Sequence, residues 1–269
     1  MKENIFIFDI DGVIRDVSMS YRKSIQLTVK YYTNWMPSMH EIDLLKSEGI
    51  FNNDWDLSLE LIKRKKHTLK NASKLIQKED LVNVFNNFYF GNSGQFSDIE
   101  SSNGLIKQEK LLINRQFFEK LESLKYPYGF VSGSEKESAE FVLKKKLGLK
   151  DFNLISMEDA PGKPNPKGLI TMINKLKTRN IQSNNRTIFY IGDTVSDTMT
   201  VMNAKKELCQ ERIISIGIIP PHLQKTDCLD RKKKYTEILI KSGSEIIIDS
   251  LNDLFDGINK FAENCFLPQ

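Results

Sequence analysis

The pattern of apolar and polar residues begins with a short run that predicts a buried strand. Residues 5–8 are apolar and β-favouring, and the run ends in the acids Asp9 and Asp11 and in Gly12. Strands that are covered on both faces are apolar along their length. Acids at the carboxyl end of such a strand lie where open α/β sheets bind ligands. A plain strand followed by an Asp-Gly turn is the alternative, and this stretch alone leaves both interpretations open.

The spacing of apolar residues becomes helical from about residue 18 to residue 90, with no intervening strand. Residues 91–104 are then rich in serine, asparagine and glycine, which predicts a loop or linker. This part of the chain is therefore predicted to be a small helical module. Its helices are expected over residues 21–32, 39–48, 55–66 and 78–89.

Strands and helices alternate from about residue 111 onward, which indicates βαβ units and a mostly parallel sheet. The helix after the first of these strands begins with Ser134 and Glu137, which match a capping box. The predicted fold class is therefore α/β, a doubly wound parallel sheet interrupted by the helical module. Its later strands are expected over residues 128–131, 152–155, 187–191, 213–216 and 245–248.

Composition narrows the function classes. The chain has 269 residues, 40% of them hydrophobic, and a net charge of +4, which mildly favours anionic ligands and gives no argument for nucleic acid. Basic runs at residues 63–67 and 231–234 are predicted to be solvated helix faces. The cysteines are odd in number and widely spaced, as in reducing compartments. No apolar run approaches the ~20 residues of a membrane helix. We therefore expect a soluble, cytoplasmic protein that does not bind a membrane.

Groups suited to binding phosphate follow the predicted strands. Ser132 and Gly133 come directly after one strand, where a hydroxyl and free backbone N–H groups at a helix start bind anions. A simple N-cap is the alternative. Lys163 lies in a proline-rich loop that fixes the backbone and presents the amine at a set place. The alternative there is a surface turn with a solvated lysine.

Two further acids, Asp193 and Asp197, follow the strand expected at residues 187–191 and share a face if a helix has begun. Acids that only cap the helix are the alternative. The separations of Ser132, Lys163 and Asp193 along the chain are each close to the ~30 residues of one βαβ unit. Crossovers of this length return the chain to one edge of the sheet. These side chains, together with Asp9 and its neighbours, are thus expected to converge there.

In this order the motifs resemble those of the haloacid dehalogenase superfamily, and the resemblance covers essentially the whole chain. The large helical insertion is similar to that of subfamily I, the class with a helical cap that includes phosphoglycolate-phosphatase-like enzymes. The resemblance implies a Rossmann-like catalytic core of residues 1–16 and 105–269 and an all-helical cap domain of residues 17–104. The motifs are Asp9-Ile10-Asp11-Gly12, Ser132, Lys163-Pro164 and Gly192-Asp193-x-x-x-Asp197.

The resemblance also implies catalytic roles. Asp9 is expected to be the nucleophile that forms an aspartyl-phosphate, and Asp11 the general acid and base. Superfamily members that cleave carbon–halogen or phosphonate bonds generally lack an aspartate at the Asp11 position. Ser132 and Gly133 are expected to bind the phosphoryl oxygens, while Lys163 balances their charge. Ser132 replaces a more common threonine and keeps the hydroxyl.

A cation is expected beside these acids, because several anionic groups do not gather around a phosphate without one. Hard oxygen ligands with room for water suit Mg²⁺. The expected ligands are the Asp9 carboxylate, the backbone carbonyl of Asp11, and Asp193. Asp197 is expected to act through a metal-bound water or to hold Lys163.

The predicted function is Mg²⁺-dependent hydrolysis of a small phosphorylated metabolite, a phosphomonoester. The alternatives are a phosphomutase of the same superfamily and a non-catalytic protein that binds such a metabolite. Substrate choice is expected from Arg15 at the hinge and from Asn53 and Trp55 in the helical module, which suit a sugar-like or polyol leaving group. Alternatively, Trp55 is core of that module and its polar neighbours cap a helix.

Overall fold

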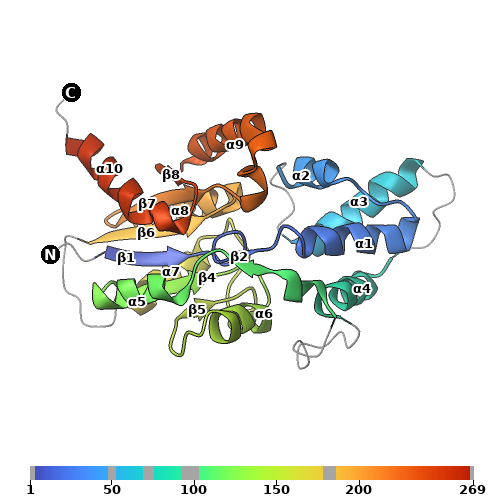
Figure 1. Ribbon diagram of the computed structural model, residues 1–269, viewed down its shortest axis with the longest axis horizontal. Coiled ribbons are helices and arrows are strands. Elements are labelled where there is room, and N and C mark those ends of the chain that lie inside the picture. Colours follow the sequence, from blue (N-terminus) through green and yellow to red (C-terminus); the bar gives the residue numbers. More distant parts are fainter. Residues whose placement is uncertain (1–3, 48–52, 69–75, 92–102, 178–185, 267–269) are drawn as a thin grey trace. The chain divides into compact units, whose positions relative to one another are not determined.

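The computed structural model divides the chain into two compact units, residues 1–16 with 111–269 and residues 17–110. We call them the core unit and the helical unit (Figure 1). The chain therefore leaves the core unit shortly after its first strand and returns to it about a hundred residues later. The structure describes residues 4–47, 53–68, 76–91, 103–177 and 186–266.

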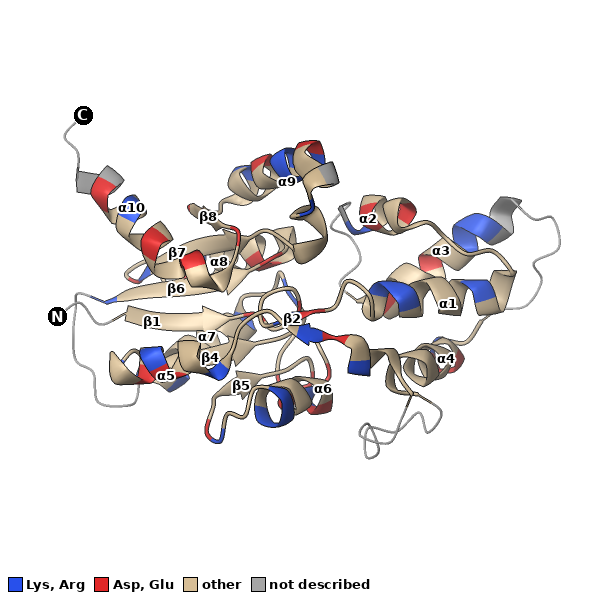
Figure 2. Ribbon diagram, viewed as in Figure 1, with Lys and Arg blue, Asp and Glu red and all other residues tan. Residues whose placement is uncertain are grey.

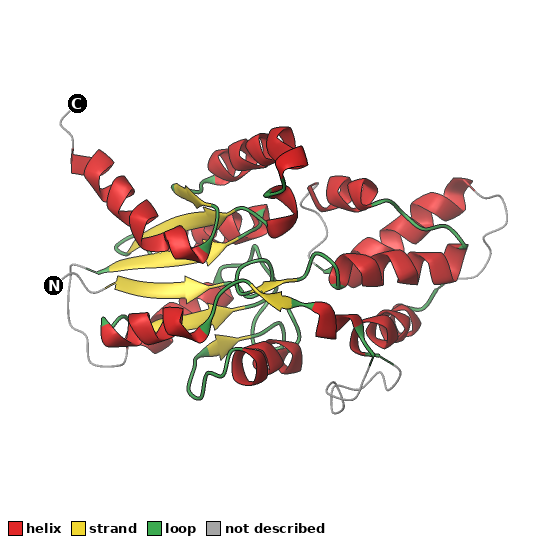
Figure 3. Cartoon of the chain, in the orientation of Figure 1, coloured by secondary structure: helices red, strands yellow, loops and turns green. Residues whose placement is uncertain are grey.

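A parallel sheet forms the centre of the core unit (Figures 1 and 3). Over the described residues it has six strands in the order β5-β4-β1-β6-β7-β8, so β1 lies in the middle between β4 and β6. All neighbouring strands run parallel, and this confirms the predicted doubly wound α/β sheet. The strands are β1 (Asn4–Phe8), β4 (Tyr128–Val131), β5 (Leu154–Ile155), β6 (Thr187–Gly192), β7 (Arg212–Ile218) and β8 (Ile246–Ile248).

Both faces of the sheet are covered, which explains why β1 is apolar throughout. Phe6 and Phe8 are buried in one hydrophobic cluster, whereas Ile5 and Ile7 are buried in another on the opposite face. With both faces filled, a ligand is left with the loops at the strand ends. Helices that contribute to the first cluster are α5 (Arg115–Ser123), α6 (Lys136–Glu140) and α10 (Leu254–Phe266), and helices that contribute to the second are α7 (Lys167–Lys177) and α8 (Val195–Glu207).

Shorter elements complete the core unit. A π-helical turn continues directly from α6, and α9 packs near the end of β8. Two short strands, β2 and β3, pair with each other. These elements are β2 (Arg15–Asp16), β3 (Lys110–Leu111), η3 (Phe141–Lys146), η4 (Pro221–Leu223), η5 (Thr226–Cys228), α9 (Leu229–Ser242) and η6 (Leu251–Asp253).

The capping box predicted for Ser134 and Glu137 is wrong. Helix α6 begins at Lys136, and its N-cap is Glu135, which makes no side-chain cap hydrogen bond. The Ser134 hydroxyl lies 2.7 Å from the Ser132 hydroxyl, and the Ser134 backbone N–H donates to the same oxygen at 3.1 Å. The Ser134 hydroxyl, which the sequence pattern predicted to cap the helix, thus contacts Ser132 instead.

The helical unit consists mainly of helices, at positions within two residues of those predicted. Its core includes Tyr21 stacked on Tyr89, with ring centroids 4.5 Å apart. The loop expected over residues 91–104 lies largely outside the described residues. Within the described parts of the chain, no helix is both long and apolar enough to cross a membrane. The elements are α1 (Tyr21–Thr33), α2 (Met39–Ser47), α3 (Asp54–Thr68), α4 (Lys78–Phe90) and η2 (Leu105–Gln108).

The two basic runs lie on helix surfaces, as predicted (Figure 2). In α3, Lys63 and Arg64 are exposed, and Arg64 pairs with Glu60 one turn earlier at 2.9 Å. In α9, Arg231 and Lys233 are exposed as well. The described side chains of these runs are exposed or half-buried on helix surfaces, which agrees with the prediction of solvated helix faces.

Candidate active site

The central strands run parallel, so their carboxyl ends lie at one edge of the sheet (Figure 3), and the sequence motifs follow these ends. Phe8, the last residue of β1, pairs in register with Phe130 of β4 and Ile191 of β6. The backbone N–H of Asp9 then donates to the Ile191 carbonyl at 2.8 Å. The residues that follow these three strands are therefore neighbours, although they are far apart in sequence.

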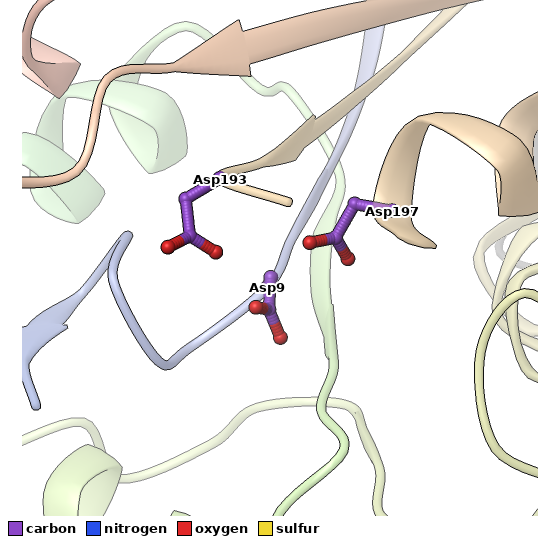
Figure 4. A group of neighbouring side chains, drawn as sticks. All are labelled: Asp9, Asp193 and Asp197. Atoms are coloured by element: carbon purple, nitrogen blue, oxygen red, sulfur yellow. The ribbon is translucent and has the colours of Figure 1, made fainter. Parts of the chain in front are cut away.

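Three aspartates converge at this edge (Figure 4). Among the described residues, Asp9, Asp193 and Asp197 each offer one carboxylate oxygen, and these oxygens lie within 4.8 Å of one another. Asp9 follows β1, Asp193 follows β6, and Asp197 lies in the first turn of α8. Close packing of the backbone makes this possible: a Cβ at Gly12, whose φ is +82°, would collide with the Asp193 carboxylate.

Lys163 links two of these acids. Its Nζ lies 2.7 Å from Asp9 Oδ1 and 2.6 Å from Asp197 Oδ1, and its side chain is 13% exposed. The alternative of a solvated lysine on a surface turn is therefore wrong. One ammonium group shared among three carboxylates leaves the cluster with an excess of negative charge when all three are ionised.

Asp197 is held by hydrogen bonds at both carboxylate oxygens. Oδ1 accepts from Lys163 and from the Tyr190 hydroxyl at 2.8 Å, while Oδ2 accepts from the backbone N–H and the hydroxyl of Thr194. The Thr194 hydroxyl in turn accepts from the Asp197 backbone N–H, which completes a capping box at the start of α8. Asp197 therefore caps its helix and also fixes Lys163.

Asp193 is bonded differently. Its Oδ1 is buried and has no hydrogen-bond partner among the residues that the structure describes. The Tyr235 hydroxyl donates to the Asp193 backbone carbonyl at 2.7 Å and so holds the main chain there. A buried, unpartnered carboxylate oxygen beside a second carboxylate is the donor set that a hard divalent cation requires. The residues thus fit the Mg²⁺ ion expected from the sequence.

Burial and charge shift the pKa values of this cluster in opposite directions. Burial raises the pKa of Asp9 to about 7, although Lys163 opposes the shift. Burial, reinforced by Asp197 and Asp9, raises the pKa of Asp193 well above its usual range. Burial also opposes ionisation of Asp197, but Lys163 and the hydrogen bonds at both oxygens bring its pKa below the ordinary value. Nearby Asp197 and Asp9 hold the pKa of Lys163 well above normal despite its burial.

Ser132 lies at the same edge, directly after β4. It is buried, and its backbone N–H donates to the Ile155 carbonyl of β5 at 2.9 Å. A Cβ built at Gly133 would meet nothing within 4 Å, so the space beside this backbone is open. The two residues thus present a hydroxyl and an uncrowded main chain at the end of the strand.

Comparison with known proteins identifies the family. Residues 3–204 match the family model for haloacid dehalogenase-like hydrolases, a span that contains every residue of the cluster. The chain belongs to this family of hydrolases. The superfamily and the hydrolase class expected from the motifs are thereby confirmed.

Individual relatives of this haloacid dehalogenase-like hydrolase have diverse names. A protein of Phytophthora nicotianae named imidazoleglycerol-phosphate dehydratase is 26% identical over 258 residues, which are 93% of this chain and 51% of the relative. The chain thus spans about half the length of that relative. A predicted phosphoglycolate phosphatase of Haemophilus somnus is 14% identical with a TM-score of 0.66, covering 95% of this chain and 98% of its own. A putative β-phosphoglucomutase of Bacteroides vulgatus is 13% identical with a TM-score of 0.59, and the match covers 99% of this chain and 91% of that protein's chain. These two structures show the shared fold.

Asp11 and Arg15 of this hydrolase pair with each other. The Arg15 side chain is fully buried, and its Nε donates to Asp11 Oδ1 at 2.5 Å. Its Nη2 donates to the Ser138 hydroxyl at 3.0 Å. The structure therefore turns the Asp11 carboxylate toward Arg15, and Arg15 reaches from the turn after β1 to α6.

Asn53 and Trp55 lie in the helical unit, where each has a structural partner. Asn53 Oδ1 accepts from the Asp56 backbone N–H at 2.8 Å, which makes Asn53 the N-terminal cap of α3. Trp55 is half-buried and packs edge-on against Phe85, with ring centroids 6.5 Å apart. Both contacts match the structural alternative that the sequence left open.

Sequence reasoning missed Tyr190 and Thr194, which hold Asp197. The spacing of Thr194 and Asp197 is a capping-box signal that was available in the sequence. Tyr190 lies in the middle of an apolar strand and gives no such signal, because its hydroxyl finds Asp197 only after the strand and helix have packed.

Proposed function

We propose that this hydrolase cleaves small phosphomonoesters in a Mg²⁺-dependent reaction with Asp9 as the nucleophile. The observation that carries the proposal is the cluster of three carboxylates at the carboxyl end of the sheet, two of which pair with Lys163. Its excess negative charge when ionised and the unpartnered Asp193 oxygen favour a cation, and a phosphoryl group supplies oxygens that a cation and an ammonium group would share.

In the first step an Asp9 carboxylate oxygen attacks phosphorus, and the bond from phosphorus to the leaving oxygen breaks. Asp11 gives its proton to that oxygen, so that an alcohol leaves and an aspartyl-phosphate remains. Ser132 and the backbone N–H of Gly133 hydrogen-bond the phosphoryl oxygens. Lys163, fixed by Asp197, offsets the charge that spreads over these oxygens.

In the second step the Asp11 carboxylate takes a proton from water as the water oxygen attacks phosphorus. The bond between phosphorus and Asp9 breaks, which releases inorganic phosphate and restores both carboxyl groups. Asp9, the Asp11 carbonyl and Asp193 would hold Mg²⁺, with Asp197 contributing through Lys163 or a bound water. The ion supplies charge neutralisation for the phosphoryl group and the carboxylates.

We also propose that the domains divide this work as the family resemblance implies. Residues 1–16 and 105–269 would form the catalytic core, and residues 17–104 a cap that selects the substrate, with Asn53, Trp55 and the hinge residue Arg15 as its candidate contacts. A cytoplasmic location remains part of the proposal, and the absence of a disulfide at Cys209 and Cys228, among the described residues, is compatible with it.

The test is phosphate release by the purified protein with Mg²⁺ across a panel of phosphomonoesters. The panel holds an aryl phosphate, sugar and polyol phosphates and, because the Phytophthora relative is named for imidazoleglycerol-phosphate, an imidazole-bearing ester. We expect turnover that disappears with a chelator and falls by about 10³-fold or more in Asp9→Asn. Asp256→Asn, an exposed acid of the core unit, is the matched control.

The outcomes separate the alternatives. Borohydride trapping of an aspartyl-phosphate at Asp9, together with release of phosphate, supports the hydrolase. A trapped intermediate that is returned to a second hydroxyl of a sugar phosphate, without net phosphate release, indicates the phosphomutase. Binding of phosphorylated metabolites with neither trapping nor turnover would point to the non-catalytic protein and contradict the proposal.

A further inference from the structure

Arg15 pairs with Asp11, but Arg15 itself takes no part in the chemical steps above. Arg15 is the largest of the fully buried side chains among the described residues. A guanidinium group keeps its charge in proteins, so burying it is costly unless carboxylates and other acceptors surround it. Asp11, the residue proposed as general acid and base, is one carboxylate that pairs with it.

The main chain fixes this pair in a tight turn. The backbone N–H groups of Ile14 and Arg15 both donate to the Ile10 carbonyl, at 2.8 and 3.1 Å. The Gly12 N–H donates to the Arg15 carbonyl at 2.8 Å. Asp11 and Arg15 therefore stand at set positions on a closed loop that begins directly after the nucleophile.

The Arg15 side chain is in turn anchored at its far end. Nη2 donates to Ser138 of α6, while Nε donates to Asp11 Oδ1. A planar guanidinium that is held at two points fixes both the position and the plane of its acceptor. The Asp11 carboxylate is thus held through Oδ1, while its side chain remains 23% exposed.

We propose that Arg15 is a positioning residue, which acts through Asp11 by fixing the rotamer in which the free carboxylate oxygen faces the leaving group. This inference rests on the proposed phosphatase function. Proton transfer requires an approach within about 3 Å, and a misplaced group loses most of its effect. The role differs from the substrate contact that the sequence suggested for Arg15, because the fully buried guanidinium donates to Asp11 and Ser138.

The test uses leaving groups that differ in their need for a proton. An alkyl phosphate requires protonation of its leaving oxygen. The leaving oxygen of 4-nitrophenyl phosphate needs a proton far less, because nitrophenolate is a stable anion. We expect Arg15→Met to lower the rate of leaving-group release in a single turnover, which isolates the first step, by about 10²-fold or more for the alkyl ester, with less than about a tenfold loss for the aryl ester and no change in KM for that step. Asp11→Asn should show the same selectivity. Arg115→Met, which replaces a surface arginine of the core unit, is the control.

A double-mutant cycle identifies the path of the effect. If Arg15 acts only through Asp11, adding Arg15→Met to Asp11→Asn causes no further loss on either ester. Additive losses, equal losses on both esters, or a raised KM would overturn the inference. Because Arg15 is fully buried, Ser138→Ala and Arg15→Lys serve as milder variants, and both should lose rate selectively on the alkyl ester while their melting temperatures stay within a few degrees of wild type.

The failure of this inference is distinct from failure of the proposed function. A wild type that hydrolyses both esters, but whose Arg15 variants lose both rates equally, overturns only the role of Arg15. A wild type that hydrolyses neither ester, with Mg²⁺ present, overturns the phosphatase proposal and the positioning role together.

Discussion

Both units of the molecule bury acids, but they treat them differently. In the helical unit, Glu109 accepts hydrogen bonds from the hydroxyls of Ser20 and Tyr89, at 2.6 and 2.9 Å. In the core unit, Asp9 and Asp193 are crowded with a third carboxylate around one ammonium group. An isolated acid that accepts hydrogen bonds from hydroxyl groups indicates a structural role, whereas crowded acids with shifted pKa values indicate a functional one.

Removal of Lys163 should have the largest effect, because Lys163 is the ammonium group that pairs with the crowded carboxylates of the core unit. We expect Lys163→Met to lower turnover by about 10³-fold, since the charge on the phosphoryl oxygens and the position of Asp197 are both lost. Steady-state hydrolysis of an aryl phosphate measures this. Lys177→Met, which removes a surface lysine that pairs with Glu211, should leave the rate within about twofold. Comparable rates in the two variants would contradict the assignment of Lys163.

The pH dependence of metal binding should be the next largest effect. Because the pKa of Asp9 in the folded protein is about 7, above its ordinary value of 3.8, ionisation costs stability as pH rises between these values. Asp193 shifts in the same direction. The lowered pKa of Asp197 acts only at more acidic pH, and the raised pKa of Lys163 acts only at alkaline pH. Bound Mg²⁺ would offset the cost.

The expected outcome is therefore a melting temperature that rises more on adding Mg²⁺ at pH 8 than at pH 5.5, by roughly 2–4 °C or more. Differential scanning fluorimetry at matched ionic strength measures it. Asp193→Asn, which removes one proposed ligand, should reduce the rise at pH 8. An equal rise at both pH values would mean that protons and the cation do not compete for these carboxyl groups.

Much of the core and of the site was predictable from the sequence because both depend on local patterns. Apolar runs bounded by polar loops located the strands, and the βα spacing indicated that Lys163 and Asp193 would meet Asp9. Contacts that form only on packing were not predictable. The Ser134 hydroxyl contacts Ser132 instead of capping α6, and the buried Arg15 guanidinium donates to Ser138, a partner 123 residues away that no spacing along the chain signals.

Substitution of Glu109 tests the other half of the comparison, namely that the buried acid of the helical unit serves stability and not turnover. Glu109→Ala leaves the hydroxyls of Ser20 and Tyr89 without this buried acceptor, and we expect it to cost about 2 kcal/mol of stability. Turnover at a temperature well below the transition should stay within about twofold of wild type. Urea unfolding and steady-state kinetics on the same preparation measure both. A loss of turnover as large as that of the Lys163 variant would place Glu109 among functional acids.

The smallest effect is expected at Asn53. Two substitutions there distinguish its role as a helix cap from a role as a substrate contact. Asn53→Ala removes the acceptor for the Asp56 backbone N–H and should cost about 1 kcal/mol of stability. Asn53→Ser keeps an N-cap oxygen and should restore most of that stability. If Asn53 only caps α3, KM stays constant in both variants. If KM rises in Asn53→Ala and stays high in Asn53→Ser, Asn53 is instead a substrate contact. Serine can cap the helix, but its side chain is too short to replace the amide group at a substrate.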